Sequence, residues 1–354
     1  MEHHMKVFLS FVTRFFFLFL FIGPAVANPS ATGYHLLKKV PLAAAVGEGE
    51  YFDYITFDPS TRRMYVSHGT EFKVLDADTA KEVGTIKGLK RCHGIALVNE
   101  LGKGFITDGE SGTVLMVDLK TLKTIGTVKA APDADAILYD PASNHIFSFN
   151  GDSRNATVID PKSGTVVGTI DLGGAPENAV ADGKGTIYNN NEEKNDVVVI
   201  DSRTLAIKTR WPLSPAGGPT AIAMDVKHHR IFSAGRDPQK LVIMNADNGK
   251  IIQSFDISAG VDSAVYESDT GLVFCSTREG MIHIFHEDTP DKFSIVETVK
   301  TELGAKTMAL DPKTHNLYLS TSDFGATPAP TPEHPHPRPA AIRGTFRLLI
   351  FGRS

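Results

Sequence analysis

Seven polar residues recur along the chain at intervals of 40 to 44 residues, and a short apolar segment follows each of them. Four carry carboxylates, and the others carry an imidazole, a hydroxyl and an ammonium group: Asp53, His93, Asp135, Glu177, Thr220, Asp262 and Lys306. Carboxylates that face one another in a confined space repel, so they need a counter-charge, raised pKa values, water or a bound cation. If the fold gathers these seven side chains, they could bind a polar ligand or a metal ion.

A metal site would draw on a subset of these residues. Carboxylate oxygens favour hard cations such as Ca²⁺ or Mg²⁺, and an imidazole extends the choice to transition metals. Asp135, Glu177 and His93 are the candidate ligands. A divalent ion held there could lower the pKa of a bound water, with a spare carboxylate as the base, as in a lactonase-like, metal-assisted hydrolase. The alternative is structural, because the same side chains could cap loop amides and bridge neighbouring repeats around a water-filled channel.

The repeat itself predicts the elements that position these residues. The third copy contains four short segments enriched in β-branched and aromatic residues, at 136–139, 145–150, 156–160 and 165–170. Clusters of Pro, Gly, Asn and Asp separate them, as expected for strands joined by turns, and such short loops require antiparallel pairing. Four strands in each period are typical of a β-propeller blade. We therefore predict an all-β, seven-bladed propeller of four-stranded antiparallel blades, with the seven polar residues around the mouth of its central channel.

The two ends of the chain are predicted to share the last blade. The seventh repeat supplies only three strand-like segments before the chain reaches Ser354. One strand-like segment, 34–42, remains unassigned ahead of the first blade. Pairing of this N-terminal strand in blade seven would remove an open sheet edge and close the ring.

The first 27 residues have the pattern of a secretory signal peptide. Lys6 and Arg14 precede an apolar run at 15–22, and small residues provide a cleavage site near Ala27. The run is too short to span a bilayer, and no other segment approaches the length of a membrane helix. We expect a periplasmic or secreted protein in which residues 28–354 form a single propeller without a transmembrane segment.

Composition and motifs argue against several classes of function. The chain has 36 Lys and Arg against 41 Asp and Glu, a formal net charge of −5, and no basic run, so we expect no nucleic-acid partner. It has no CxxCH, HExxH or GxSxG motif and only one tryptophan, so we expect neither haem nor quinone. Cys92 and Cys275 belong to distant repeats and are expected to be free thiols. We favour a monomeric binding protein over an enzyme.

Loops between the second and third strands of the blades should crowd the same face as the channel mouth. They offer side chains that suit a sugar, a carboxylate or a peptide: His68, Asp108, Asn150, Asn190, Arg236 and Arg278. Arg236 and Arg278 would orient an anionic or polar partner. The same residue types are ordinary in exposed turns, so a purely structural role is the alternative.

The corresponding loop of the seventh repeat is much longer. It contains six prolines within 328–339, together with His334, His336 and Arg338. Such a stretch favours an extended polyproline II conformation. It could cover the channel mouth as a lid, serve as a docking strip, or pack on its own blade as a stiff surface loop.

Several strand segments resemble those of a known family. The segments VVVID, TVID and KVLDADT, and the strands MYVSH and LYLST, are similar to those of YVTN-repeat propellers, in particular the YncE-like exported branch. The resemblance covers all seven repeats, and it implies a secreted or surface propeller used for binding, with no common reaction. One YncE-like member is associated with DNA binding, but the acidic balance of this chain argues against that partner.

We therefore expect an exported binding platform that takes a small polar ligand or a protein partner through its top face and channel mouth. The metal-assisted hydrolase is the first alternative, with a divalent cation such as calcium as its cofactor. A structural envelope or surface protein is the second.

Overall fold

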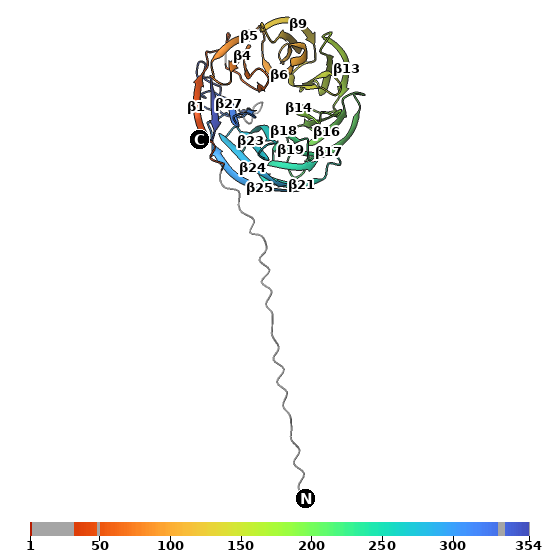
Figure 1. Ribbon diagram of the computed structural model, residues 1–354. Helices are drawn as coiled ribbons and strands as arrows, with labels where there is room; N and C mark the ends of the chain where they lie inside the picture. The colour runs from red at the N-terminus through yellow and green to blue at the C-terminus, as the bar shows by residue number, and fades with distance from the viewer. Residues whose placement is uncertain (2–31, 48–49, 332–336, 354) are drawn as a thin grey trace.

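The fold is a ring of seven four-stranded sheets (Figure 1). The computed structural model describes residues 1, 32–47, 50–331 and 337–353. Neighbouring strands within the sheets pair antiparallel, which confirms the predicted fold class. Apart from Met1, the predicted signal peptide and its cleavage site lie outside the described residues. In the described part of the chain, no helix has the length and apolar character needed to cross a membrane.

The first three blades follow the chain from an inner strand at the channel to an outer strand at the rim. Blade 1 contains β2 (Ile55–Asp58), β3 (Arg63–His68), β4 (Glu71–Asp76) and β5 (Glu82–Lys87). Blade 2 contains β6 (Cys92–Val98), the short 3₁₀ helix η1 (Asn99–Leu101), β7 (Lys103–Asp108), β8 (Thr113–Asp118) and β9 (Lys123–Lys129). Blade 3 contains β10 (Ala134–Asp140), β11 (His145–Asn150), β12 (Asn155–Asp160) and β13 (Thr165–Asp171).

The next three blades repeat this order, and blade 7 departs from it. Blade 4 contains β14 (Pro176–Ala181), β15 (Thr186–Asn191), β16 (Asp196–Asp201) and β17 (Ile207–Pro212). Blade 5 contains β18 (Pro219–Asp225), β19 (Arg230–Arg236), β20 (Gln239–Asn245) and β21 (Ile251–Asp256). Blade 6 contains β22 (Val261–Glu267), β23 (Leu272–Thr277), β24 (Met281–Thr289) and β25 (Lys292–Lys300). Blade 7 contains β26 (Met308–Asp311), β27 (Asn316–Thr321), β28 (Arg347–Gly352) and β1 (His35–Pro41).

Each pair of neighbouring blades shares a hydrophobic core. Buried apolar side chains of the described residues form seven clusters, one at each interface between blades. Between blades 3 and 4, for example, Phe147 and Phe149 belong to the same cluster as Ile187 and Val198. The strands β11 and β12 are buried on both faces because both faces meet a neighbouring blade, whereas the outer strand β13 is largely exposed. Stability therefore depends on the ring as a whole.

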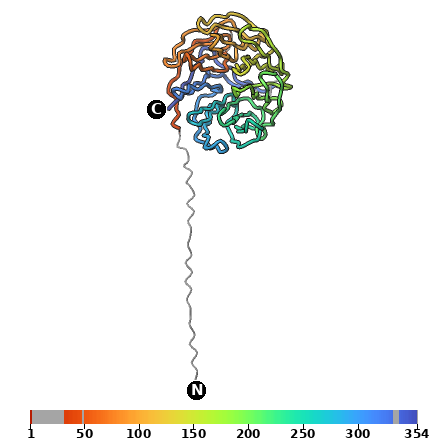
Figure 2. Tube along the Cα trace, turned by 45° about the vertical axis from the view of Figure 1, so that its right-hand side comes forward, coloured from red at the N-terminus to blue at the C-terminus, as the bar shows by residue number. Residues whose placement is uncertain are grey.

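The N-terminal strand closes the ring, as predicted. β1 pairs antiparallel with β28, so the order of blade 7 from channel to rim is β26, β27, β28, β1. The backbone N–H of Leu42 extends the pairing by donating to Phe346 O at 3.0 Å. In Figure 2 the red N-terminal strand and the blue C-terminal end lie at the same edge of the ring. This pairing covers an edge of β28 that would otherwise be open.

Irregular pairing marks the start of the inner strands in blades 2 to 6, where five of the seven polar residues lie. In blades 2 to 6 the inner strand has a register shift against its partner, and the polar residue lies within the shift. In β10, Ala134 pairs with Asn150 and the next paired residue is Ile137, so Asp135 falls outside the regular ladder. Such bulges re-aim side chains at the end of a sheet. Asp53 precedes the first residue of β2 by two positions.

Removal of β1 tests the closure of the ring. A chain that lacks every residue through Pro41 leaves the edge of β28 unpaired. We expect its melting temperature in calorimetry to fall by roughly 5 °C or more. We also expect it to self-associate in size-exclusion chromatography with light scattering. A chain that begins at residue 32 and keeps β1 is the control, and equal melting temperatures for the two chains would contradict the closing role of β1.

Candidate functional site

The channel mouth contains a cavity of about 370 Å³. Five of the seven predicted residues line it: Asp53, Asp135, Glu177, Asp262 and Lys306. Its volume lies in the lower part of the range found for small-molecule sites. The repeat thus brings together, at one opening, side chains that lie up to 253 residues apart in the sequence.

A buried ammonium group neutralises two of the carboxylates. Lys306 Nζ donates to Asp53 Oδ1 at 3.0 Å and also to Asp262 Oδ2. Burial alone would raise the pKa of both carboxyls, but the charge of Lys306 outweighs it and holds both pKa values below the usual range. Burial likewise works against the charge of Lys306, yet Asp262 and Asp53 raise its pKa. The three groups are therefore charged together and link blades 1, 6 and 7.

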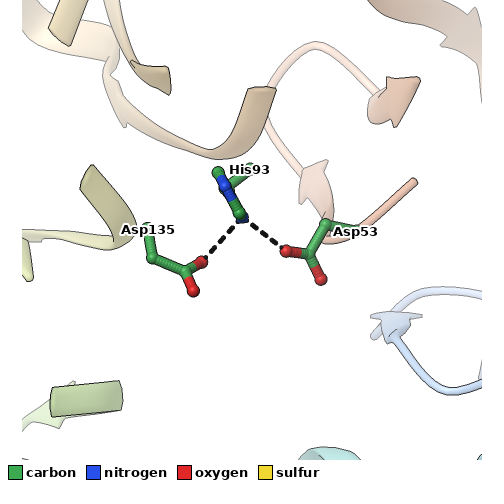
Figure 3. A group of neighbouring side chains, drawn as sticks. All are labelled: Asp53, His93 and Asp135. Atoms are coloured by element: carbon green, nitrogen blue, oxygen red, sulfur yellow. Dashed lines mark hydrogen bonds and ion pairs between the residues drawn. The ribbon is translucent and has the colours of Figure 1, made fainter. Parts of the chain in front are cut away.

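His93 is buried, does not line the cavity, and contacts aspartates from the two neighbouring blades (Figure 3). Its Nδ1 atom lies 2.7 Å from Asp53 Oδ2, 2.9 Å from Asp135 Oδ1 and 3.0 Å from the Tyr51 hydroxyl. Burial opposes a charge on the ring, but Asp135 and Asp53 raise the pKa of His93 to about 10. The imidazole is thus a cation at neutral pH, and it offsets the charge of the two aspartates. Its other nitrogen, Nε2, is buried and has no hydrogen-bond partner among the described residues.

Two carboxyls on the side of blades 3 and 4 keep unused hydrogen-bonding capacity, and we call Asp135 and Glu177 the acidic arc. Asp135 Oδ1 is buried in an ion pair with His93 Nδ1 at 2.9 Å, whereas the other carboxylate oxygen, Oδ2, accepts no hydrogen bond from the described residues. Glu177 Oε1 lies 3.7 Å from Arg236 Nη1, which is too far for a hydrogen bond. Burial, followed by the charge of Asp135, raises the pKa of Glu177 well above its usual value.

Three arginines line the cavity from the side of blades 5 to 7, and we call Arg236, Arg278 and Arg338 the basic arc. They also line an adjoining cavity of about 320 Å³. Arg236 is well satisfied, because it donates to Glu192 Oε1 at 2.9 Å and also to Asp262. These contacts, together with the nearby Glu177, raise the pKa of Arg236 against the effect of burial.

Arg278 is less satisfied than Arg236. Within the described residues it has one ion pair, between its Nη2 and Asp262 Oδ2 at 3.8 Å, and its guanidinium donates no hydrogen bond. Only about a third of the side chain is exposed. Burial lowers the pKa of Arg278, and the neighbouring Arg338 and Arg236 lower it further, against the opposing effect of Asp262. Its guanidinium therefore keeps donor groups that face the cavity without an acceptor.

The long loop of blade 7 forms one wall of the cavity. Phe324 and Ala341 make an isolated antiparallel bridge that folds the loop back on itself. The backbone N–H of Gly344 donates to Glu50 Oε1 at 2.7 Å, which ties the loop to the start of blade 1. This fold brings Arg338 to the cavity. Arg338 and Pro339 of the Pro-rich segment thus line the cavity, and the choice among lid, docking strip and stiff surface loop stays a prediction.

The remaining predicted residues lie elsewhere. Four top-face residues are buried and do not line either cavity: His68, Asp108, Asn150 and Asn190. Asn190, for example, donates to a backbone carbonyl of blade 5 at 2.9 Å. Thr220 donates to the backbone of Gly218 at 3.2 Å. His334 and His336 lie outside the described residues.

The predicted metal ligands are partly gathered. Ligand atoms of Asp53, His93 and Asp135 lie within 4.8 Å of one another, and Glu177 does not belong to this group within the described structure. A carboxylate pair with one imidazole is a plausible donor set for a divalent cation. However, Lys306 and the charged His93 already provide positive charge beside these carboxylates. A metal ion would have to displace the Nδ1 proton of His93.

The repeat contains a further signal that the sequence interpretation missed. Two positions before each of the seven polar residues, the first three copies carry large side chains and the last four carry alanine or glycine: Tyr51, Arg91, Asp133, Ala175, Gly218, Gly260 and Gly304. A Cβ atom at Gly260 would lie 2.6 Å from the Cβ of Arg278, and one at Gly304 would clash with the ring of Phe324. The small residues therefore leave room for Arg278 and for the loop of blade 7.

Comparisons with known proteins support the fold. No protein-family model matches the chain, and no curated protein sequence matches it. Among solved structures, the structure of U3-55K has a TM-score of 0.70 at 11% identity, over 91% of this chain and 99% of that one. A chain of the mitotic checkpoint complex has a TM-score of 0.69 at 11% identity, over 89% of this chain and 95% of that one. Hydrazine synthase of Kuenenia stuttgartiensis has a TM-score of 0.67 at 14% identity, over 78% of this chain and 94% of that one. At these identities the likeness shows the β-propeller fold.

Lys306→Met tests the shared ion pair. The substitution leaves Asp53 and Asp262 buried close together without the ammonium that both contact. We expect the free energy of unfolding at neutral pH, measured by urea denaturation, to fall by about 3–5 kcal/mol. Adding Asp53→Asn and Asp262→Asn should recover part of this loss, because the uncompensated charges are then gone. An unchanged loss in the triple variant would contradict the account.

Glu177→Gln tests the buried carboxyl. Because folding raises the pKa of Glu177, the folded protein keeps this proton at pH values where the unfolded chain loses it, so stability falls as pH rises above the ordinary glutamate pKa. Glutamine stays neutral. At about pH 8 we expect the variant to be more stable by roughly 1–3 kcal/mol, and the difference to vanish near pH 4. Urea denaturation across this range measures it, and a difference that does not depend on pH would refute the assignment.

Proposed function

We propose that the protein binds a small organic anion, through a carboxylate, in the cavity at the channel mouth. The observation that carries the proposal is the guanidinium of Arg278, which lines the cavity, is mostly buried, and donates no hydrogen bond within the described structure. An arginine fork in this state matches the two oxygens of a carboxylate. Arg338 lines the same cavity and carries a second positive charge.

The other cations that line the cavity already contact acidic or aromatic residues. Arg236 is held by Glu192 and Asp262, and Lys306 is held by Asp53 and Asp262. Arg91 pairs with Asp133 at 3.5 Å and lies over the ring of Tyr51. These contacts fix the wall of the cavity and leave few donors for a ligand. Arg278 and Arg338 are therefore the residues that would bind the anion, with Arg236 as support.

The wider setting of the proposal is an exported, monomeric binding protein. The resemblance to YVTN-repeat, YncE-like propellers supports this class, and the pattern of the first 27 residues supports a periplasmic or secreted location. A propeller also suits a protein partner at its top face. We favour a small ligand because Arg278 lies in a cavity that a small molecule can enter and a flat protein surface cannot.

A metal-assisted hydrolase is the second candidate, and the grouping of Asp53, His93 and Asp135 favours it. A divalent ion held by these residues would activate a water molecule, and Glu177 is the nearby carboxyl that could take its proton. Metal analysis of the purified protein before and after chelation tests this candidate, and a stoichiometric divalent ion would support it.

Arg278→Gln tests the proposed function. We expect at least one member of a panel of carboxylates and aminocarboxylates to raise the melting temperature of the natural chain, because a ligand that prefers the folded state stabilises it. The variant should lose most of this shift. Arg154→Gln is the control, since Arg154 pairs with the exposed Glu193 and does not line the cavity. Equal shifts in Arg278→Gln and the natural chain would count against the site.

A further inference from the structure

The charged groups of the cavity fall into those that the protein pairs itself and those that it does not. Asp53 and Asp262 contact Lys306, and Asp262 also contacts Arg236. Asp135 Oδ1 pairs with His93, and Arg91, which also lines the cavity, pairs with Asp133. After this pairing, Asp135 Oδ2 and Glu177 accept no hydrogen bond from the described residues. On the basic side, Arg278 remains with unfilled donors, and Arg338 stands beside it. The cavity therefore presents an unfilled acidic arc and an unfilled basic arc.

The two arcs lie on opposite sides of one space. Asp135 and Glu177 start the inner strands of blades 3 and 4, whereas Arg278 follows β23 of blade 6 and Arg338 belongs to the loop of blade 7. Blades 3 and 4 lie across the ring from blades 6 and 7 (Figure 1). All four side chains nevertheless line the same cavity of about 370 Å³. A single small molecule can thus contact both arcs.

We propose that the ligand is an aminocarboxylate, whose carboxylate is held by Arg278 and Arg338 while its ammonium group lies between Asp135 and Glu177. This inference rests on the proposed function, because it adds a partner for the acidic arc to an anion already held by the basic arc. An ammonium group there would donate to Glu177 and to Oδ2 of Asp135, neither of which accepts a hydrogen bond from the described residues.

Other classes of ligand fit less well. A dicarboxylate or an organic phosphate would place negative charge toward the carboxylate of Asp135, which would repel it. A simple amine would leave the arginines without an anion. Tyr54 lines the same cavity, and its pKa is raised by burial and then by Asp135, which places its phenol beside the acidic arc. Its aromatic ring suits an ammonium group, since cations are attracted to aromatic faces.

Matched ligands test the inference with the full mature protein. Isothermal titration calorimetry would compare δ-aminovalerate, valerate and pentylamine, which share a carbon chain and differ in the charged ends. We expect δ-aminovalerate to bind at least tenfold more tightly than valerate, and pentylamine to bind most weakly. The series from glycine to ε-aminocaproate should show one preferred chain length, set by the span between the arcs.

Glu177→Gln separates this inference from the proposed function. The variant should lose at least tenfold in affinity for the preferred aminocarboxylate and keep its affinity for valerate within about twofold. Glu193→Gln, which alters an exposed acid of the same blade, is the control and should change neither affinity. Both variants are expected to remain folded, which their melting temperatures verify.

The outcomes distinguish the two proposals. If valerate binds as tightly as δ-aminovalerate, or if Glu177→Gln weakens both equally, the aminocarboxylate assignment is overturned and the anion site stands. If no carboxylate of either kind binds, or if Arg278→Gln leaves their binding unchanged, the anion site itself is overturned, and the further assignment falls with it.

Discussion

Each blade of this ring buries its faces only against neighbouring blades, so the seven sheets must stand radially and their inner strands must begin around one axis. This constraint determines where the polar residues of the repeat meet. The hydrophobic clusters between blades set the spacing of the inner strands, and the register shifts at their first residues direct side chains to the channel mouth. The same packing that stabilises the fold therefore concentrates charge at one opening.

Buried carboxylates that lie close together need cationic partners, and such partners are unevenly distributed around the channel mouth. Lys306 offsets the negative charge of Asp53 and Asp262. His93 offsets the charge of Asp53 and Asp135. Among the described residues, Glu177 has only a distant ion pair with Arg236, and Arg278 has only a distant one with Asp262. This separation of a weakly paired acid from a weakly paired base gives the cavity its chemical character. A purely structural ring would be expected to pair its buried charges more completely.

The repeat period was enough to predict the blade number, the closure by the N-terminal strand and the convergence of Asp53, Asp262 and Lys306, because all of these follow from equivalent positions in equivalent blades. Features without equivalents could not be predicted in this way. Arg338 belongs to a loop that only the seventh repeat has, so the period gives it no position. Asn190 is of a type common in exposed turns, yet it is buried because its amide bridges two blades. Roles as ligand contacts stay predictions.

A carbon-detected NMR titration of the side-chain carboxyls tests the central claim most directly, namely that the channel mouth separates compensated from uncompensated acids. The account predicts that Asp53 and Asp262 titrate below the usual aspartate range, because Lys306 contacts both, and that Glu177 titrates well above the usual glutamate range. Titration of all three groups near their ordinary values would contradict it, since the arrangement of charges described for the cavity could not then be present.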